Sequence, residues 1–77
     1  MKLYWVSAII QNEADKKPKL IAMNTAELSL EEAIRVVSDV KSHNTVLSVW
    51  VDVFDENSTK QTVFHECYIN AFGDIMA

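Results

Sequence analysis

A single segment of this 77-residue chain has helical periodicity, and it lies between segments with the character of β-strands. Within residues 28–44, "LSLEEAIRVVSDVKSHN", apolar side chains recur every three or four positions, which predicts one amphipathic helix. Ser29 followed by Glu32 has the spacing of a capping box, and Asn44 is predicted to end the helix in a left-handed conformation. Because one helix covers only one face of a sheet, the other face becomes the informative one.

Four segments rich in β-branched and aromatic residues flank the helix, two on each side: 3–11, about 19–25, 46–54 and 61–72. Pro18 cannot donate a hydrogen bond to a neighbouring strand, which favours an edge position for the second strand. The order strand-strand-helix-strand-strand, with a right-handed crossover, predicts an α+β fold. It is a four-stranded antiparallel sheet in the order 2-1-3-4 with the helix on one face, and residues 1–77 form one domain.

Composition limits where such a small domain acts. Cys67 is the only cysteine, which favours a reducing cytoplasm. No apolar run is long enough to span a membrane, and the apolar run near the start is interpreted as a strand rather than a signal peptide. Seven basic and eleven acidic residues give a net charge of −4, which weakens attraction to nucleic-acid phosphates and to anionic lipid.

Alternation along the strands assigns side chains to the two faces of the sheet. The aliphatic row Leu47, Val49, Val51 and Val53 and the smaller set of the first strand are predicted to face the helix. In the last strand, His65 and Cys67 are predicted to face the helix as well. The other face then carries six large apolar side chains: Trp5, Ile9, Trp50, Phe54, Phe64 and Tyr68.

Such a face exceeds the apolar surface that a soluble monomer usually leaves in water. We expect a second copy of the chain to cover it, because two-fold dimers dominate soluble oligomers. The alternatives are another protein, a flat ligand, the C-terminal segment 71–77 folded back, or an error in the face assigned to one strand.

His65 and Cys67 are also candidate metal ligands, since they share one side of a strand. Two ligands are fewer than the three of a catalytic zinc site or the four of a structural one. Two copies would supply Cys₂His₂ only if both residues lined the dimer face, and the predicted alternation places them toward the helix. We therefore predict no metal and a buried, unreactive Cys67 thiol.

No other pattern predicts catalysis or a cofactor. Asp55, Asn57 and Thr59 have the spacing of a calcium-binding loop, but Lys60 stands where that loop needs glycine, which favours a polar hairpin turn. Phosphate-binding loops need several glycines, and the chain has one. Asp52 lies among the aromatic side chains, where a carboxylate can act as an acid or base. We interpret it as hydrogen-bonded to Ser or Thr across the sheet.

The predicted function is a non-catalytic protein-interaction module, without cofactor or metal, that self-associates through its aromatic face. The alternative on the same face is a binder of single-stranded nucleic acid or of a flat ligand, because exposed rings can stack on bases. Such a platform also needs surrounding cations, and lysines gather only at residues 16–19. Nucleic acid is therefore the weaker expectation.

Overall fold

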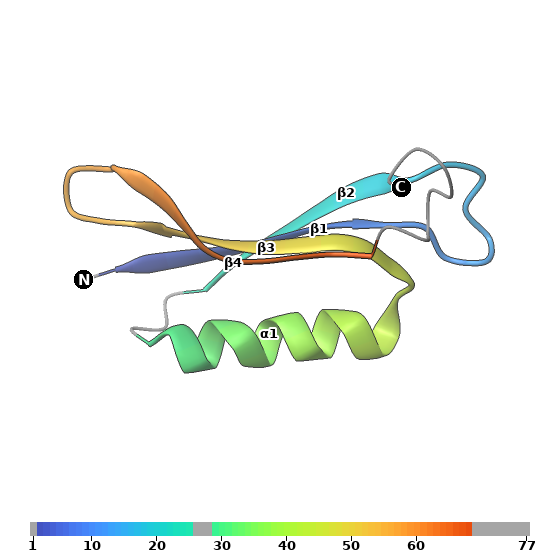
Figure 1. Cartoon of the computed structure of the whole chain (residues 1–77), viewed down its shortest axis with the longest axis horizontal. Coiled ribbons are helices and arrows are strands. Elements are labelled where there is room, and N and C mark those ends of the chain that lie inside the picture. The colour runs from blue at the N-terminus through green and yellow to red at the C-terminus, as the bar shows by residue number, and fades with distance from the viewer. Residues whose placement is uncertain (1, 26–28, 69–77) are drawn as a thin grey trace.

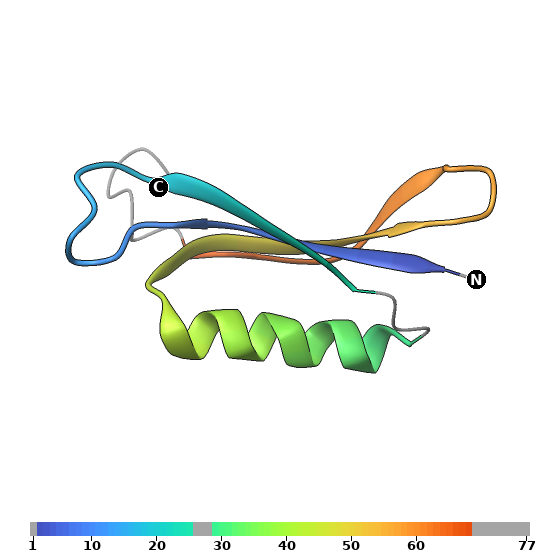
Figure 2. The ribbon, with the colours of Figure 1, turned by 180° about the vertical axis from the view of Figure 1, so that it is seen from behind.

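The computed structural model describes residues 2–25 and 29–68 of the chain. Within them the elements follow the order β1 (Leu3–Ile10), β2 (Lys19–Thr25), α1 (Leu30–His43), β3 (Val46–Phe54) and β4 (Lys60–Cys67). The strands form one antiparallel sheet in the order β2-β1-β3-β4, and α1 lies along one of its faces (Figures 1 and 2). The predicted α+β fold and sheet order are confirmed. The predicted end of the last strand and segment 71–77 lie outside the described residues.

The helix begins at its predicted N-cap residue, although the Glu32 carboxylate pairs with Arg35 instead of completing the capping box. Ser29 is the extended N-cap residue, and its hydroxyl oxygen accepts a hydrogen bond from the Glu32 amide at 3.2 Å. At the other end the prediction is wrong, because Asn44 is extended (φ −142°, ψ 157°) rather than left-handed. Its side-chain amide instead donates to the Val40 carbonyl at 3.0 Å, which satisfies one of the carbonyls that a helix end leaves without a partner. Of the helices in the described chain, none combines the length and apolar character needed to cross a membrane.

Asn12 fastens the loop after β1 to the loop between α1 and β3. Its side-chain oxygen accepts from the Thr45 amide at 2.7 Å, and its side-chain nitrogen donates to the Asn44 oxygen at 2.9 Å. The Gln11 amide also donates to the Thr45 carbonyl at 3.0 Å. These contacts tie the C-terminal end of α1 to the adjacent end of the sheet.

The core lies between α1 and the two central strands. Val6 of β1 and Val49 and Val51 of β3 are almost completely buried. The predicted helix-facing set of the first strand and three of the four residues predicted for the third are confirmed, because the buried cluster and the residues packed against it include these side chains: Tyr4, Val6, Ala8, Ile10, Val49, Val51 and Val53. The fourth, Leu47, is buried but does not belong to this cluster; the β1–β3 register shifts there, and Val46 packs against the cluster instead. The helix contributes Ala33, Val37 and Val40 to this cluster.

A β-bulge at Val63 interrupts the pairing of β4 with β3. Asp52 of β3 lies opposite Thr62, and the preceding residue of β3, Val51, lies opposite Phe64, so Val63 has no residue facing it. An extra residue of this kind breaks the alternation of side chains between the two faces of a strand. The side occupied before the bulge therefore does not predict the side occupied after it.

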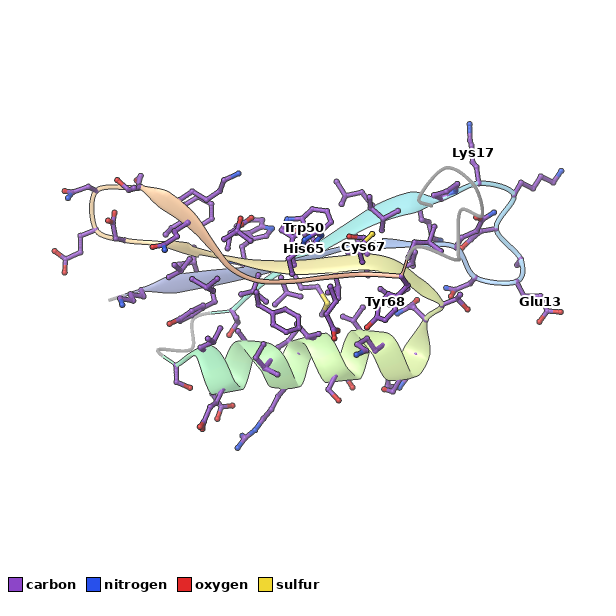
Figure 3. The ribbon with its side chains drawn as sticks, viewed as in Figure 1. Glu13, Lys17, Trp50, His65, Cys67 and Tyr68 are labelled. Carbon is purple, nitrogen blue, oxygen red and sulfur yellow. The ribbon has the colours of Figure 1, made fainter. Side chains whose placement is uncertain are left out.

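The predicted faces of β4 after the bulge are wrong. Phe64 and Tyr68 pack against the core on the helix side. Glu66 pairs with Lys41 of α1, at 3.0 Å between Oε1 and Nζ. Figure 3 shows Tyr68 between the sheet and the helix and Cys67 on the other side of the sheet.

Candidate interaction face

The candidate site is the face of the sheet opposite α1, which we call the open face. No element of residues 2–25 and 29–68 lies over it (Figures 1 and 2). The strand registers place the following side chains on it: Leu3, Trp5, Ser7 and Ile9 of β1; Leu20, Ala22 and Asn24 of β2; Ser48, Trp50, Asp52 and Phe54 of β3; and Lys60, Thr62, His65 and Cys67 of β4.

The open face brings together four of the six residues predicted for it: Trp5, Ile9, Trp50 and Phe54. The other two, Phe64 and Tyr68, belong to the helix side. The sequence prediction missed Leu20, which lies opposite Ile9 and, at 65%, is the most exposed large apolar side chain among residues 2–25 and 29–68. Alternation along β2, together with the correctly predicted face of β1, would have placed Leu20 on the open face.

Two edge-to-face ring contacts hold the aromatic side chains in place across the strands. The rings of Trp5 and Phe54 have centroids 6.4 Å apart and planes at 70°. The rings of Trp50 and His65 are also 6.4 Å apart, with planes at 77°. Edge-to-face geometry is favoured because the positive edge of one ring meets the negative face of the other. The indoles are therefore held as half-buried parts of a fixed surface.

Small polar residues between these rings are buried even though no described element covers them. Ser7, Ser48 and Asp52 have exposed fractions of only 7%, 8% and 6%. The polar side chains at the centre of the open face are therefore buried, whereas those nearer its edges, such as Asn24 and Thr62, are exposed.

Asp52 is hydrogen-bonded across the sheet, as predicted. The Thr62 hydroxyl donates to Asp52 Oδ1 at 2.5 Å. A buried carboxyl group without a hydrogen-bond partner would be costly. The hydrogen bond from Thr62 therefore offsets part of the free-energy cost of burying Asp52 between aromatic side chains.

Ser48 and His65 form a second polar contact, with Oγ and Nε2 3.2 Å apart. The Ser48 hydroxyl also donates to the Glu66 carbonyl at 3.4 Å. Because a hydroxyl has one hydrogen, Ser48 then accepts from His65 rather than donating to it. Activation of a serine nucleophile needs the reverse, with histidine accepting the hydroxyl proton.

Cys67 lies on the open face opposite Ser48, and its side chain is exposed. The prediction of a buried thiol is wrong, because the bulge turns Cys67 away from the helix. His65 shares this face, as the alternation requires. In the described part of the chain, no three His, Cys, Asp or Glu side chains gather as a metal site would need.

A pocket of about 340 Å³ opens at the end of the open face nearest the β3–β4 hairpin. Its lining residues are Leu3, Trp5, Phe54, Asp55 and Ser58. Asp55 Oδ1 accepts from the amides of Asn57 and Thr59, each at 2.9 Å, and so holds the polar turn predicted here. Ser58 has a positive φ of 63° within this turn. The pocket is therefore lined by the aromatic rings of Trp5 and Phe54 and by the Asp55 carboxylate, which the turn holds in position.

The helix side carries a separate polar cluster that fastens β4 to α1. The Tyr68 hydroxyl donates to Glu66 Oε1 at 2.7 Å, and Lys41 Nζ lies 3.0 Å from the same oxygen and 5.5 Å from the Tyr68 ring centroid. The Tyr68 hydrogen bond, and then Lys41, lower the pKa of Glu66. Hydrogen bonding to Tyr68, and then to Glu66, raises the pKa of Lys41. Both shifts favour the ionised pair.

Comparison of the chain with protein-family models, with curated proteins and with solved structures finds no match.

Proposed function

We propose that the chain is a non-catalytic interaction module that forms a homodimer by packing two open faces together. The observation that supports this is the coverage of the sheet. The helix covers one face, whereas the other presents Trp5, Trp50 and Phe54 with no described element over them. Large apolar patches of this kind are typical of protein interaction sites.

The charge of the open face favours a second copy. Among the side chains placed on it, Asp52 is buried and hydrogen-bonded, and Lys60 and His65 lie on the edge strand β4. Two such faces meet without like charges at their centre, although the whole chain has a net charge of −4. A surface for single-stranded nucleic acid would need cations around its rings.

The arrangement of large and small side chains on the open face also suits a sheet-to-sheet contact. Ala22 and Ser7 lie beside Trp50 in one cross-strand row, so a bulky ring adjoins a strip of small side chains. In a two-fold pair, the ring of each copy packs over the small strip of the other. Stacked sheets lie about 10 Å apart, which large side chains from both copies fill.

The compartment that suits this dimer is the reducing cytoplasm. Cys67 is exposed on the open face, where an oxidising environment would promote disulfide exchange with other thiols. A free thiol at an interface persists where glutathione and thioredoxin keep it reduced.

Sedimentation equilibrium, combined with titration by a single-stranded oligonucleotide, tests the proposal. We expect the mass to approach twice 8.7 kDa at micromolar concentration, with no quenching of tryptophan fluorescence by the oligonucleotide. A mass of 8.7 kDa at every concentration would contradict the dimer. Quenching of that monomer by the oligonucleotide would identify the open face as a nucleic-acid surface instead.

A further inference from the structure

We infer that the pocket at the end of the open face receives the ammonium group of Lys17 from a second copy of the chain. This inference rests on the proposed homodimer and gives it a geometry. The strands of the two copies run in reversed directions, and each β1–β2 hairpin meets the β3–β4 end of its partner.

The pocket has the chemistry that recognises an organic ammonium group. Trp5 and Phe54 supply aromatic walls, and a cation near the face of such a ring is attracted by its electron density. Asp55 adds a carboxylate at the pocket wall. Its Oδ1 is held by two backbone amides of the turn, so the negative charge has a fixed position.

Lys17 is a cation placed to fill such a pocket in another copy. It is exposed, and no ion pair or hydrogen bond joins it to any residue among 2–25 and 29–68. Lys19 of the same hairpin is instead paired with Asp15 at 3.3 Å. Figure 3 shows Lys17 projecting on the side of the sheet away from α1, which is the side of the open face.

The two features lie at opposite ends of the sheet (Figure 1). The pocket adjoins Leu3, at the start of β1, and the hairpin follows Ile10, at its end. Eight strand residues span about 27 Å, so Lys17 cannot reach the pocket of its own chain. A two-fold axis perpendicular to the strands exchanges the two ends, whereas an axis along the strands would bring both lysine-bearing hairpins together.

The open face alone is smaller than a stable interface, which favours a dimer whose contacts extend beyond this face. Its rows supply about fifteen side chains, whereas a stable interface takes about 20–30 residues from each partner. Reversed strands add the hairpin of each copy to the contact. Seating Lys17 in the pocket therefore enlarges the interface at both ends.

Zero-length carbodiimide coupling tests the contact directly, because it joins an amine to a carboxylate only when the two groups touch. The Lys41–Glu66 pair, 3.0 Å apart within one chain, is the internal positive control. In a mixture of isotope-labelled and unlabelled chains, we expect a mixed-label peptide pair that joins Lys17 to Asp55. A dimer that gives the Lys41–Glu66 link but joins Lys17 elsewhere or not at all would overturn the inference.

Substitution gives an independent test. We expect Lys17→Gln and Asp55→Asn each to raise the dimer dissociation constant about tenfold, and the double variant to be no weaker than either single one. Asp55→Asn keeps the oxygen that holds the turn, and Lys16→Gln removes the same charge from the neighbouring residue as a matched control. Equal effects of Lys16→Gln and Lys17→Gln, or an unchanged constant in all variants, would overturn the inference while leaving the dimer intact. A monomeric wild-type chain would overturn both the inference and the proposed function.

Discussion

Trp50 and His65 lie directly opposite each other in β3 and β4, with their rings edge to face at 6.4 Å and 77°. The imidazole supports the indole on the side of the sheet away from α1. The neighbours of Trp50 on β4 are therefore a histidine and, one row on, a cysteine, rather than Phe64 and Tyr68. This moves the apolar centre of the open face toward β1 and β3.

Trp50→Ala is expected to weaken self-association strongly, because large aromatic side chains near the centre of an interface often contribute about 2 kcal/mol or more. The measurement is the dimer dissociation constant from sedimentation equilibrium. Met23→Ala is the matched control, since Met23 is 45% exposed but lies opposite Val6 on the helix side of the sheet. A Trp50→Ala dimer as tight as the wild type would show that the contact lies elsewhere.

The fold was predictable from local patterns that agree with one another. The apolar stripe of α1, its Ser29 cap and the aliphatic row of β3 each indicate the same layered arrangement. Pro18 before β2 and the crossover through α1 predicted the edge strand and the order β2-β1-β3-β4.

The face of β4 was not predictable in the same way. This strand carries apolar residues on both sides, Val63 on one and Phe64 on the other, so alternation predicts two sets but not which set meets the helix. The bulge at Val63 then breaks the alternation. The polar cluster that holds Glu66 against Lys41 depends on tertiary contacts, which no spacing within β4 indicates.

Cys67→Ala is expected to change the free energy of unfolding by less than about 0.5 kcal/mol, because the thiol is exposed and leaves no cavity. Chemical denaturation measures this value. Cys67 should also react with a thiol reagent in native protein, and more slowly as the concentration rises and the dimer forms. A thiol that reacts only after unfolding would show that Cys67 is buried.

The Glu66–Lys41 pair is expected to make the stability of the native state depend on pH in both the acid and the alkaline range. Its pKa lies below the ordinary 4.5, so its contribution is present above pH 4.5 and is lost as the pH falls through the lowered value. The raised pKa of Lys41 preserves its contribution below pH 10.5, and this is lost as the pH rises further.

Glu66→Gln should remove the acid-side loss, as measured by urea unfolding across the acid range. Glu31→Gln is the matched control, because Glu31 is exposed on the outer side of α1. The same acid-side slope in wild type and Glu66→Gln would contradict the assigned role of this cluster.

Thr62→Val is expected to destabilise the chain by about 1–3 kcal/mol, because it removes the donor from a buried carboxylate without replacing it. The free energy of unfolding in urea tests this, with Thr45→Val at an exposed position as the control. Adding Asp52→Val to Thr62→Val should recover much of the loss, since both partners are then apolar. A neutral Thr62→Val variant would show that the Asp52 contact does not support the sheet.

The most direct test of the open-face dimer is a dilution series followed by nuclear magnetic resonance. The account predicts that the indole N–H signals of Trp5 and Trp50 shift with concentration, while the methyl signals of Ala33 and Val37, buried between α1 and the sheet, stay constant. Signals that do not move at any concentration, or shifts confined to residues of α1, would contradict it.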